Sequence, residues 1–79
     1  MEELQAKRII EALLFVSGQP FTHKRLTEVL PDLSGEQIRR CVQTLNGEYA
    51  ASQRAFHIQE VAGGYQLVTD QQLAPWVKR

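Results

Sequence analysis

The fold of this chain is decided by the stretch FHIQEVAGGYQLVT, which spans residues 56–69. Apolar and polar residues alternate on both sides of the segment AGG, residues 62–64, and this pattern predicts two strands joined by a tight turn. Glycine suits such a turn because it tolerates positive φ. On the return strand, Tyr65, Leu67 and Thr69 share one face. We therefore expect an antiparallel β-hairpin in the last third of the chain.

A first helix is predicted over residues 2–17. At about 100° per residue, one face of this helix gathers the apolar side chains that we expect in the core. These core residues are Ala6, Ile9, Ile10, Leu13 and Val16. Gly18 and Pro20 should end the helix, because glycine favours the C-terminal cap and proline cannot continue the hydrogen-bond ladder.

Two more helices are predicted between the first helix and the hairpin. Thr22 is a candidate N-cap for a short helix through about residue 30, and Pro31 ends it. Ser34 and Gln37 fit a capping box at the start of a longer helix that runs to about residue 51. One face of this longer helix carries an apolar stripe made of Ile38, Cys41, Val42, Leu45 and Tyr49.

This order of elements is typical of a winged helix-turn-helix. We expect a mainly α fold of the α+β class, with three helices and an antiparallel wing of two or three strands. After the hairpin, Asp70 is predicted to cap a last helical turn that holds Leu73, Trp76 and Val77. A length of 79 residues predicts one domain, residues 1–79.

Composition and charge exclude several classes of protein. The chain is 43% hydrophobic, and its nine Lys and Arg balance nine Asp and Glu, so we expect neither disorder nor a large phosphate-binding surface. Cys41 is the single cysteine, which predicts a reducing compartment. The start is acidic, and the longest apolar run, residues 12–16, is far shorter than a membrane span. We expect a cytoplasmic protein with no membrane partner.

No enzyme is predicted from the candidate chemical groups. Catalysis would require a nucleophile beside a base, converging carboxylates or metal ligands. His23 and His57 are the only histidines and both lie far from Cys41 in the sequence. Cys41 on an apolar stripe is better interpreted as a structural core residue. We therefore expect no catalytic residue, metal, cofactor or small-molecule substrate.

DNA binding is the alternative that this fold raises. Arg39, Arg40 and Gln43 lie on the exposed face of the predicted third helix, the element that would enter the major groove. An ordinary solvated helix face explains the same residues. The turn at residues 62–64 carries no Lys or Arg, so a wing contact would add no counterion release. We expect direct DNA binding to be weak or absent.

Protein binding is indicated by surplus apolar side chains on the first helix. Leu4, Leu14 and Phe15 fall away from its predicted core face, which suggests a subunit interface. A central helix of a small bundle, apolar on all sides, is the competing interpretation. Trp76 has two interpretations: packing under the wing is favoured, and the alternative is that it anchors a partner or a following domain.

Three segments carry a family resemblance. The segments IIEALLFVSGQP, residues 9–20, and EVAGGYQLVT, residues 60–69, resemble the opening and the hairpin of the segregation and condensation protein B family. The segment APWV, residues 74–77, is similar to a short motif that follows that hairpin in the family. The three segments occur in the family's order and spacing and cover most of the chain.

The resemblance implies a non-enzymatic subunit of the bacterial condensin-like complex. That complex contains an SMC ATPase, a kleisin (segregation and condensation protein A) and a dimer of this subunit, and it acts in chromosome condensation and segregation during cell division. The resemblance further implies a homodimer that binds the kleisin and, through it, the SMC ATPase at the nucleoid. It also implies that this chain is the first of two winged-helix domains, with the second expected after Arg79.

Overall fold

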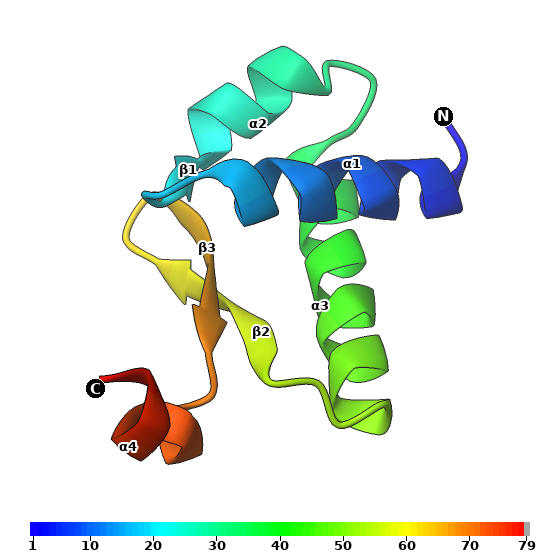
Figure 1. The fold of residues 1–79 in the computed structure, drawn as a ribbon. Helices are drawn as coiled ribbons and strands as arrows, with labels where there is room; N and C mark the ends of the chain where they lie inside the picture. Colours follow the sequence, from blue (N-terminus) through cyan, green and yellow to red (C-terminus); the bar gives the residue numbers. More distant parts are fainter. Residues whose placement is uncertain (79) are drawn as a thin grey trace.

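The computed structural model describes residues 1–78 and confirms a winged-helix arrangement (Figure 1). Its elements follow in the order α1 (Glu3–Val16), β1 (Phe21–Thr22), α2 (His23–Val29), α3 (Gly35–Ala51), β2 (Phe56–Val61), β3 (Gly64–Thr69), the 3₁₀ turn η1 (Gln71–Leu73) and α4 (Ala74–Val77). The predicted helices and hairpin are correct to within about one residue at their ends. Among the helices of residues 1–78, none combines the length and the hydrophobicity of a membrane span.

Local capping explains where the second and third helices begin. The Thr22 hydroxyl accepts a hydrogen bond from the Arg25 amide and so caps α2, as predicted. At the start of α3, the Ser34 hydroxyl accepts from the Gln37 amide, and the Gln37 side chain accepts from the Ser34 amide. The predicted capping box is therefore confirmed, and it satisfies donors that a helix end leaves without partners.

The sheet contains three antiparallel strands in the order β1-β3-β2. Gly63 has φ of +82° in the hairpin turn, the left-handed region that favours glycine. The next glycine, Gly64, pairs with Thr22 of β1 on one side and with Val61 of β2 on the other. The Gly63 carbonyl also accepts a hydrogen bond from the His23 amide, at 2.8 Å. The hairpin is thereby joined to the start of α2.

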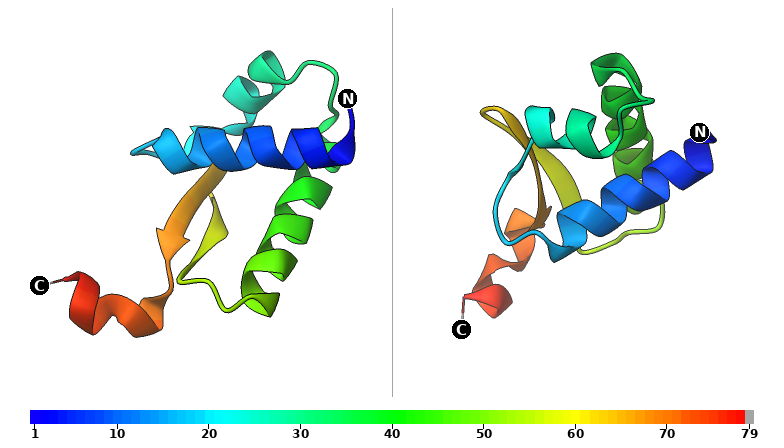
Figure 2. Two further views of the ribbon diagram at one scale, coloured as in Figure 1. Left: turned by 45° about the vertical axis from the view of Figure 1, so that its right-hand side comes forward. Right: turned by 90° about the horizontal axis from the view of Figure 1, so that it is seen from above.

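One hydrophobic core lies between the three main helices and the inner face of the sheet. Figure 2 shows α1 along one side of the molecule, with α2 and α3 behind it. Ile10, Leu26, Leu30 and Ile38 are the largest side chains that are almost fully buried. Ile58 and Tyr65 of the hairpin also belong to this core, so the wing contributes to the packing of the domain.

Asn46 attaches the free edge of the sheet to α3. Its side-chain amide donates to the Ile58 carbonyl at 2.9 Å, and its side-chain oxygen accepts from the Ile58 amide at 2.8 Å. These two bonds imitate the ladder that a further strand would make with β2. They satisfy backbone groups that an edge strand otherwise leaves open for pairing with another chain.

Replacing Asn46 by alanine should lower the free energy of unfolding by about 2 kcal/mol, because the Ile58 amide and carbonyl lose their partners in a half-buried place. The Ile58 amide should also exchange its hydrogen faster in the native state. Denaturant titration and amide exchange measure the two effects. Gln43→Ala, about one turn earlier on the exposed face of α3, is the matched control; an equal loss in both variants would contradict a specific role for Asn46.

Candidate functional site

The first helix has a buried inner side and an exposed outer side. Ala6, Ile10 and Leu14 are at most 2% exposed and fill the core. On the outer side, Leu4 is 64% exposed and Phe15 is 75% exposed. The core is therefore complete without these two large apolar side chains.

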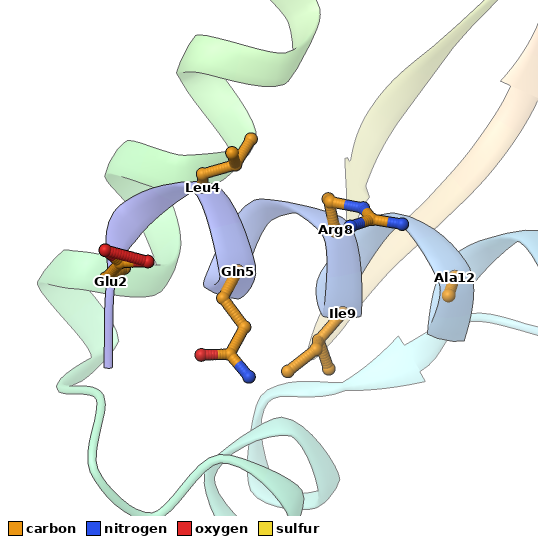
Figure 3. Close-up of a pocket in the computed structure, with 6 residues that line it drawn as sticks. All are labelled: Glu2, Leu4, Gln5, Arg8, Ile9 and Ala12. Atoms are coloured by element: carbon orange, nitrogen blue, oxygen red, sulfur yellow. The ribbon is translucent and has the colours of Figure 1, made fainter.

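The outer side of α1 is hollowed on both flanks. One hollow has a volume of about 500 Å³ and lies along the first three turns. Figure 3 shows Leu4 and Arg8 on one side of this stretch of α1, with Gln5 and Ile9 on the other. A second hollow, of about 330 Å³, includes Phe15 together with Phe56 and Leu67 of the hairpin, and it shares Arg8 and Ala12 with the first. These residues form one continuous surface of mixed apolar and charged character.

Polar contacts hold α1 against α3 beside this surface. The Tyr49 hydroxyl donates to Glu11 Oε2 at 2.5 Å, and Lys7 Nζ lies 2.5 Å from Glu48 Oε2. Burial, followed by the hydrogen bond to Glu11, raises the pKa of Tyr49, so the hydroxyl stays protonated and remains a donor. The hydrogen bond to Glu48 raises the pKa of Lys7. Both contacts join residues about 40 positions apart in the chain, and the sequence patterns did not reveal them.

Two assignments on α1 require correction. Leu14 is 2% exposed and belongs to the core, so it is not available on the surface of this chain as an interface residue. Leu14 lies on the same side of the helix as Ile10, one turn away, and the core is wide enough to include both. Val16, expected in the core, is 77% exposed because it is the last residue of α1 and no other described element covers it.

Trp76 lies on α4 and is 68% exposed, so it does not pack under the wing. Figure 1 shows α4 beyond the end of β3, away from α1, α2 and α3. The neighbouring Val77 is 58% exposed and lines a hollow of about 430 Å³ against Val68 on the outer face of the hairpin. The structure therefore places Trp76 and the α1 residues on different parts of the surface.

Asp70 occupies the predicted capping position but makes a different contact. Its side chain makes no capping hydrogen bond to η1. Instead, Asp70 Oδ1 lies 2.8 Å from His57 Nδ1, which joins the chain after β3 to the start of β2. The pairing favours this contact because Phe56 lies opposite Thr69, so the neighbouring residues meet at the open end of the hairpin.

The candidate DNA-contact residues lie together on the outer face of α3. Arg39, Arg40 and Gln43 are all exposed, as predicted. The hairpin turn presents only Ala62 and Gly63, so no cation there extends the surface toward a phosphate backbone. Neither arginine takes part in an ion pair that the described residues make with one another.

Cys41 is a buried core residue, as predicted. It is 4% exposed, and burial raises the pKa of its thiol, which keeps the sulfur in the unreactive protonated form. Within residues 1–78, no group of three or more histidine, cysteine, aspartate or glutamate side chains is placed to hold a metal ion.

Comparison with known proteins points to one family. The family model described as "Segregation and condensation complex subunit ScpB" matches residues 8–79. Segregation and condensation protein B of Symbiobacterium thermophilum is 40% identical over 92% of this chain and 33% of its own length. A segregation and condensation protein B homolog of Coxiella burnetii is 33% identical over 100% of this chain and 38% of its own length. The chain thus spans about a third of the length of these curated relatives.

Solved structures with the same fold agree. A conserved hypothetical protein from Chlorobium tepidum matches with a TM-score of 0.87 and 31% identity, over 96% of this chain and 48% of that one. The crystal structure of a dimer of the ScpB N-terminal domain complexed with a ScpA peptide matches with a TM-score of 0.81 and 28% identity, over 95% of this chain and 93% of that one.

Proposed function

Since this chain belongs to the family of the segregation and condensation complex subunit ScpB, we propose that it is a non-catalytic adaptor in a bacterial condensin-like complex. In this role it forms a homodimer, binds the kleisin ScpA and, through the kleisin, joins the SMC ATPase. The complex acts in chromosome condensation and segregation, which places the protein in the cytoplasm at the nucleoid. The dimer of the matched ScpB N-terminal domain, which carries a ScpA peptide, supports this proposal.

The observation that carries the proposal is the exposure of large apolar side chains that the core does not need. Leu4, Phe15 and Trp76 are each more than 60% exposed, although the chain is short and its core is complete. Exposed apolar surface of this kind marks sites of protein association. Hydrophobic association needs no turnover, which agrees with an adaptor. A second winged-helix domain after residue 79 stays a prediction.

Replacing Phe15 by aspartate should give a folded monomer, because a charge would be buried without a partner in the proposed dimer. We expect the dimer dissociation constant to rise at least about tenfold. Light scattering during size-exclusion chromatography measures the mass, and circular dichroism measures the fold. Val29→Asp is the matched control, because Val29 is an exposed apolar residue on α2, and this variant should remain a dimer. A dimeric Phe15→Asp variant would exclude Phe15 from the interface.

Binding to the kleisin is tested by purifying the tagged chain together with ScpA from the same cells, after nuclease treatment and at low and high salt. The proposal expects ScpA to be retained under both conditions. An Arg39→Ala, Arg40→Ala double variant should retain ScpA equally well. Binding to duplex DNA that falls steeply with salt and is lost in the double variant would instead support the DNA-binding alternative.

A further inference from the structure

The outer side of α1 carries four residues at a coiled-coil spacing. Leu4, Arg8, Glu11 and Phe15 follow one another at intervals of four, three and four residues, which places them on one seam of the helix. The two outer positions are apolar and largely exposed. The two inner positions carry opposite charges. The order of residue types along the seam is apolar, charged, charged, apolar from either end. Only the basic and the acidic position change places when the direction is reversed.

The two charges of this seam are available for a partner. Tyr49 donates to Oε2 of Glu11, which orients the carboxylate, and within residues 1–78 Oε1 has no hydrogen-bond partner. Arg8 is exposed and takes part in neither of the ion pairs that the described part of the chain makes. The seam therefore presents one oriented acid and one free base, with an apolar side chain beyond each.

We propose that a second copy of this chain packs its α1 antiparallel onto this seam, across a two-fold axis between Arg8 and Glu11. This inference rests on the homodimer of the proposed function and specifies its geometry. Leu4 then packs against the partner's Phe15, and Arg8 pairs with the partner's Glu11. The two-fold axis repeats both contacts, so each seam residue has a complementary neighbour.

The charges decide the direction of packing. In a parallel pair, Arg8 would face the partner's Arg8 and Glu11 would face the partner's Glu11, so like charges would meet twice. Like charges in an interface are strongly unfavourable, whereas opposite charges set the register. Only the antiparallel arrangement satisfies the apolar and the charged positions of the seam together.

The hollows on the two flanks of α1 match the same arrangement. Antiparallel packing brings the partner's Phe15 next to Leu4, where the hollow of about 500 Å³ lies. It brings the partner's Leu4 next to Phe15, where Phe56 and Leu67 line the second hollow. Each apolar side chain of the seam thus meets a concave surface, as knobs do in the holes of a coiled coil.

A charge exchange tests this geometry in the full 79-residue chain. Arg8→Glu makes both inner positions acidic and Glu11→Arg makes both basic, so each variant alone should lose its dimer. We expect the dimer dissociation constant of each to rise about 100-fold. Mixed together, the two variants should form a heterodimer, because every acidic position then faces a basic one. A chain that carries both substitutions should recover the homodimer.

Cysteine cross-linking gives a second measurement that does not disturb the charges. Antiparallel packing brings position 4 next to position 15 of the partner. The two copies of position 4 then lie about 16 Å apart, measured along the axis of the α1 helices. A disulfide requires Cα atoms within about 7 Å. Under oxidation, Leu4→Cys mixed with Phe15→Cys should cross-link, and neither variant should cross-link with itself. Cys41 is buried and does not compete.

The outcomes separate this proposal from the proposed function. Lys24→Glu, which reverses an exposed charge on α2, is the matched control and should stay dimeric. A wild-type chain that is monomeric at all concentrations would overturn the homodimer itself. A dimeric wild type whose Arg8→Glu and Glu11→Arg variants also remain dimers would overturn the α1 seam alone. Cross-linking of Leu4→Cys with itself would show parallel packing and would also overturn it.

Discussion

Gly64→Ala is expected to lower the free energy of unfolding by about 3 kcal/mol. A Cβ at this position would lie 2.2 Å from the Phe21 carbonyl oxygen and 2.8 Å from Thr22 Cα. Both atoms belong to the backbone, so neither can rotate away, and β1 would have to shift relative to β3. Because Phe21 is a core residue and β1 leads directly into α2, the damage should spread beyond the hairpin.

Gly47→Ala is the matched control for this prediction. Gly47 lies within α3, and a Cβ there would meet no atom within 4 Å. Alanine favours helix more than glycine does, so this variant should be more stable by about 0.5–1 kcal/mol. Thermal unfolding should therefore shift in opposite directions for the same chemical change at two glycines. A Gly64→Ala variant as stable as the wild type would contradict the close approach of β1.

Leu14→Ala is expected to lower the free energy of unfolding by about 3 kcal/mol, within the range for large-to-small changes in a core. Leu14 is 2% exposed, so the truncation removes buried apolar area and leaves a cavity between α1 and the rest of the hydrophobic core. Denaturant titration should be carried out at several protein concentrations, because dimer formation would otherwise add to the apparent stability.

Val16→Ala tests the complementary assignment, that Val16 is exposed. The helical pattern predicts Val16 in the core and Leu14 away from the core face, whereas the structure buries Leu14 and leaves Val16 77% exposed. Val16→Ala should therefore change the free energy of unfolding by less than about 0.5 kcal/mol. If Val16→Ala instead proved as destabilising as Leu14→Ala, the position of the last turn of α1 would need revision.

The local elements were predictable because their determinants are close together in the sequence. Thr22 and Ser34 cap helices through bonds to residues only three positions away. The hairpin follows from alternation on both sides of a glycine turn, which depends on backbone conformation rather than on distant contacts. The start of α3 was correct for the same reason. The prediction for α1 was less exact, because Glu2 makes no capping hydrogen bond and the C-cap is Ser17 in an extended conformation rather than Gly18.

The sequence predicted the residues of the candidate site less accurately than it predicted the helices and strands. The pattern singled out Leu4, Phe15 and Trp76, and the structure exposes all three. It also singled out Leu14, which is buried, since a helical projection shows the direction of a side chain but not the width of the core beneath it. The partner of Glu11, which is Tyr49, and the partner of the β2 edge, which is Asn46, depend on how α3 lies against other elements.

By itself, the sequence determined the order of helices and hairpin, the N-cap of α2, the capping box of α3, the hairpin turn and the family of this protein. These features depend on local hydrogen bonding, on backbone freedom and on residue patterns that can be read along the chain. The tertiary structure decided the two apolar assignments that the helical pattern missed, because it buries Leu14 in the core and leaves Val16 exposed. The physical reason is that burial is set by the elements that happen to cover a residue, and those elements come from distant parts of the chain.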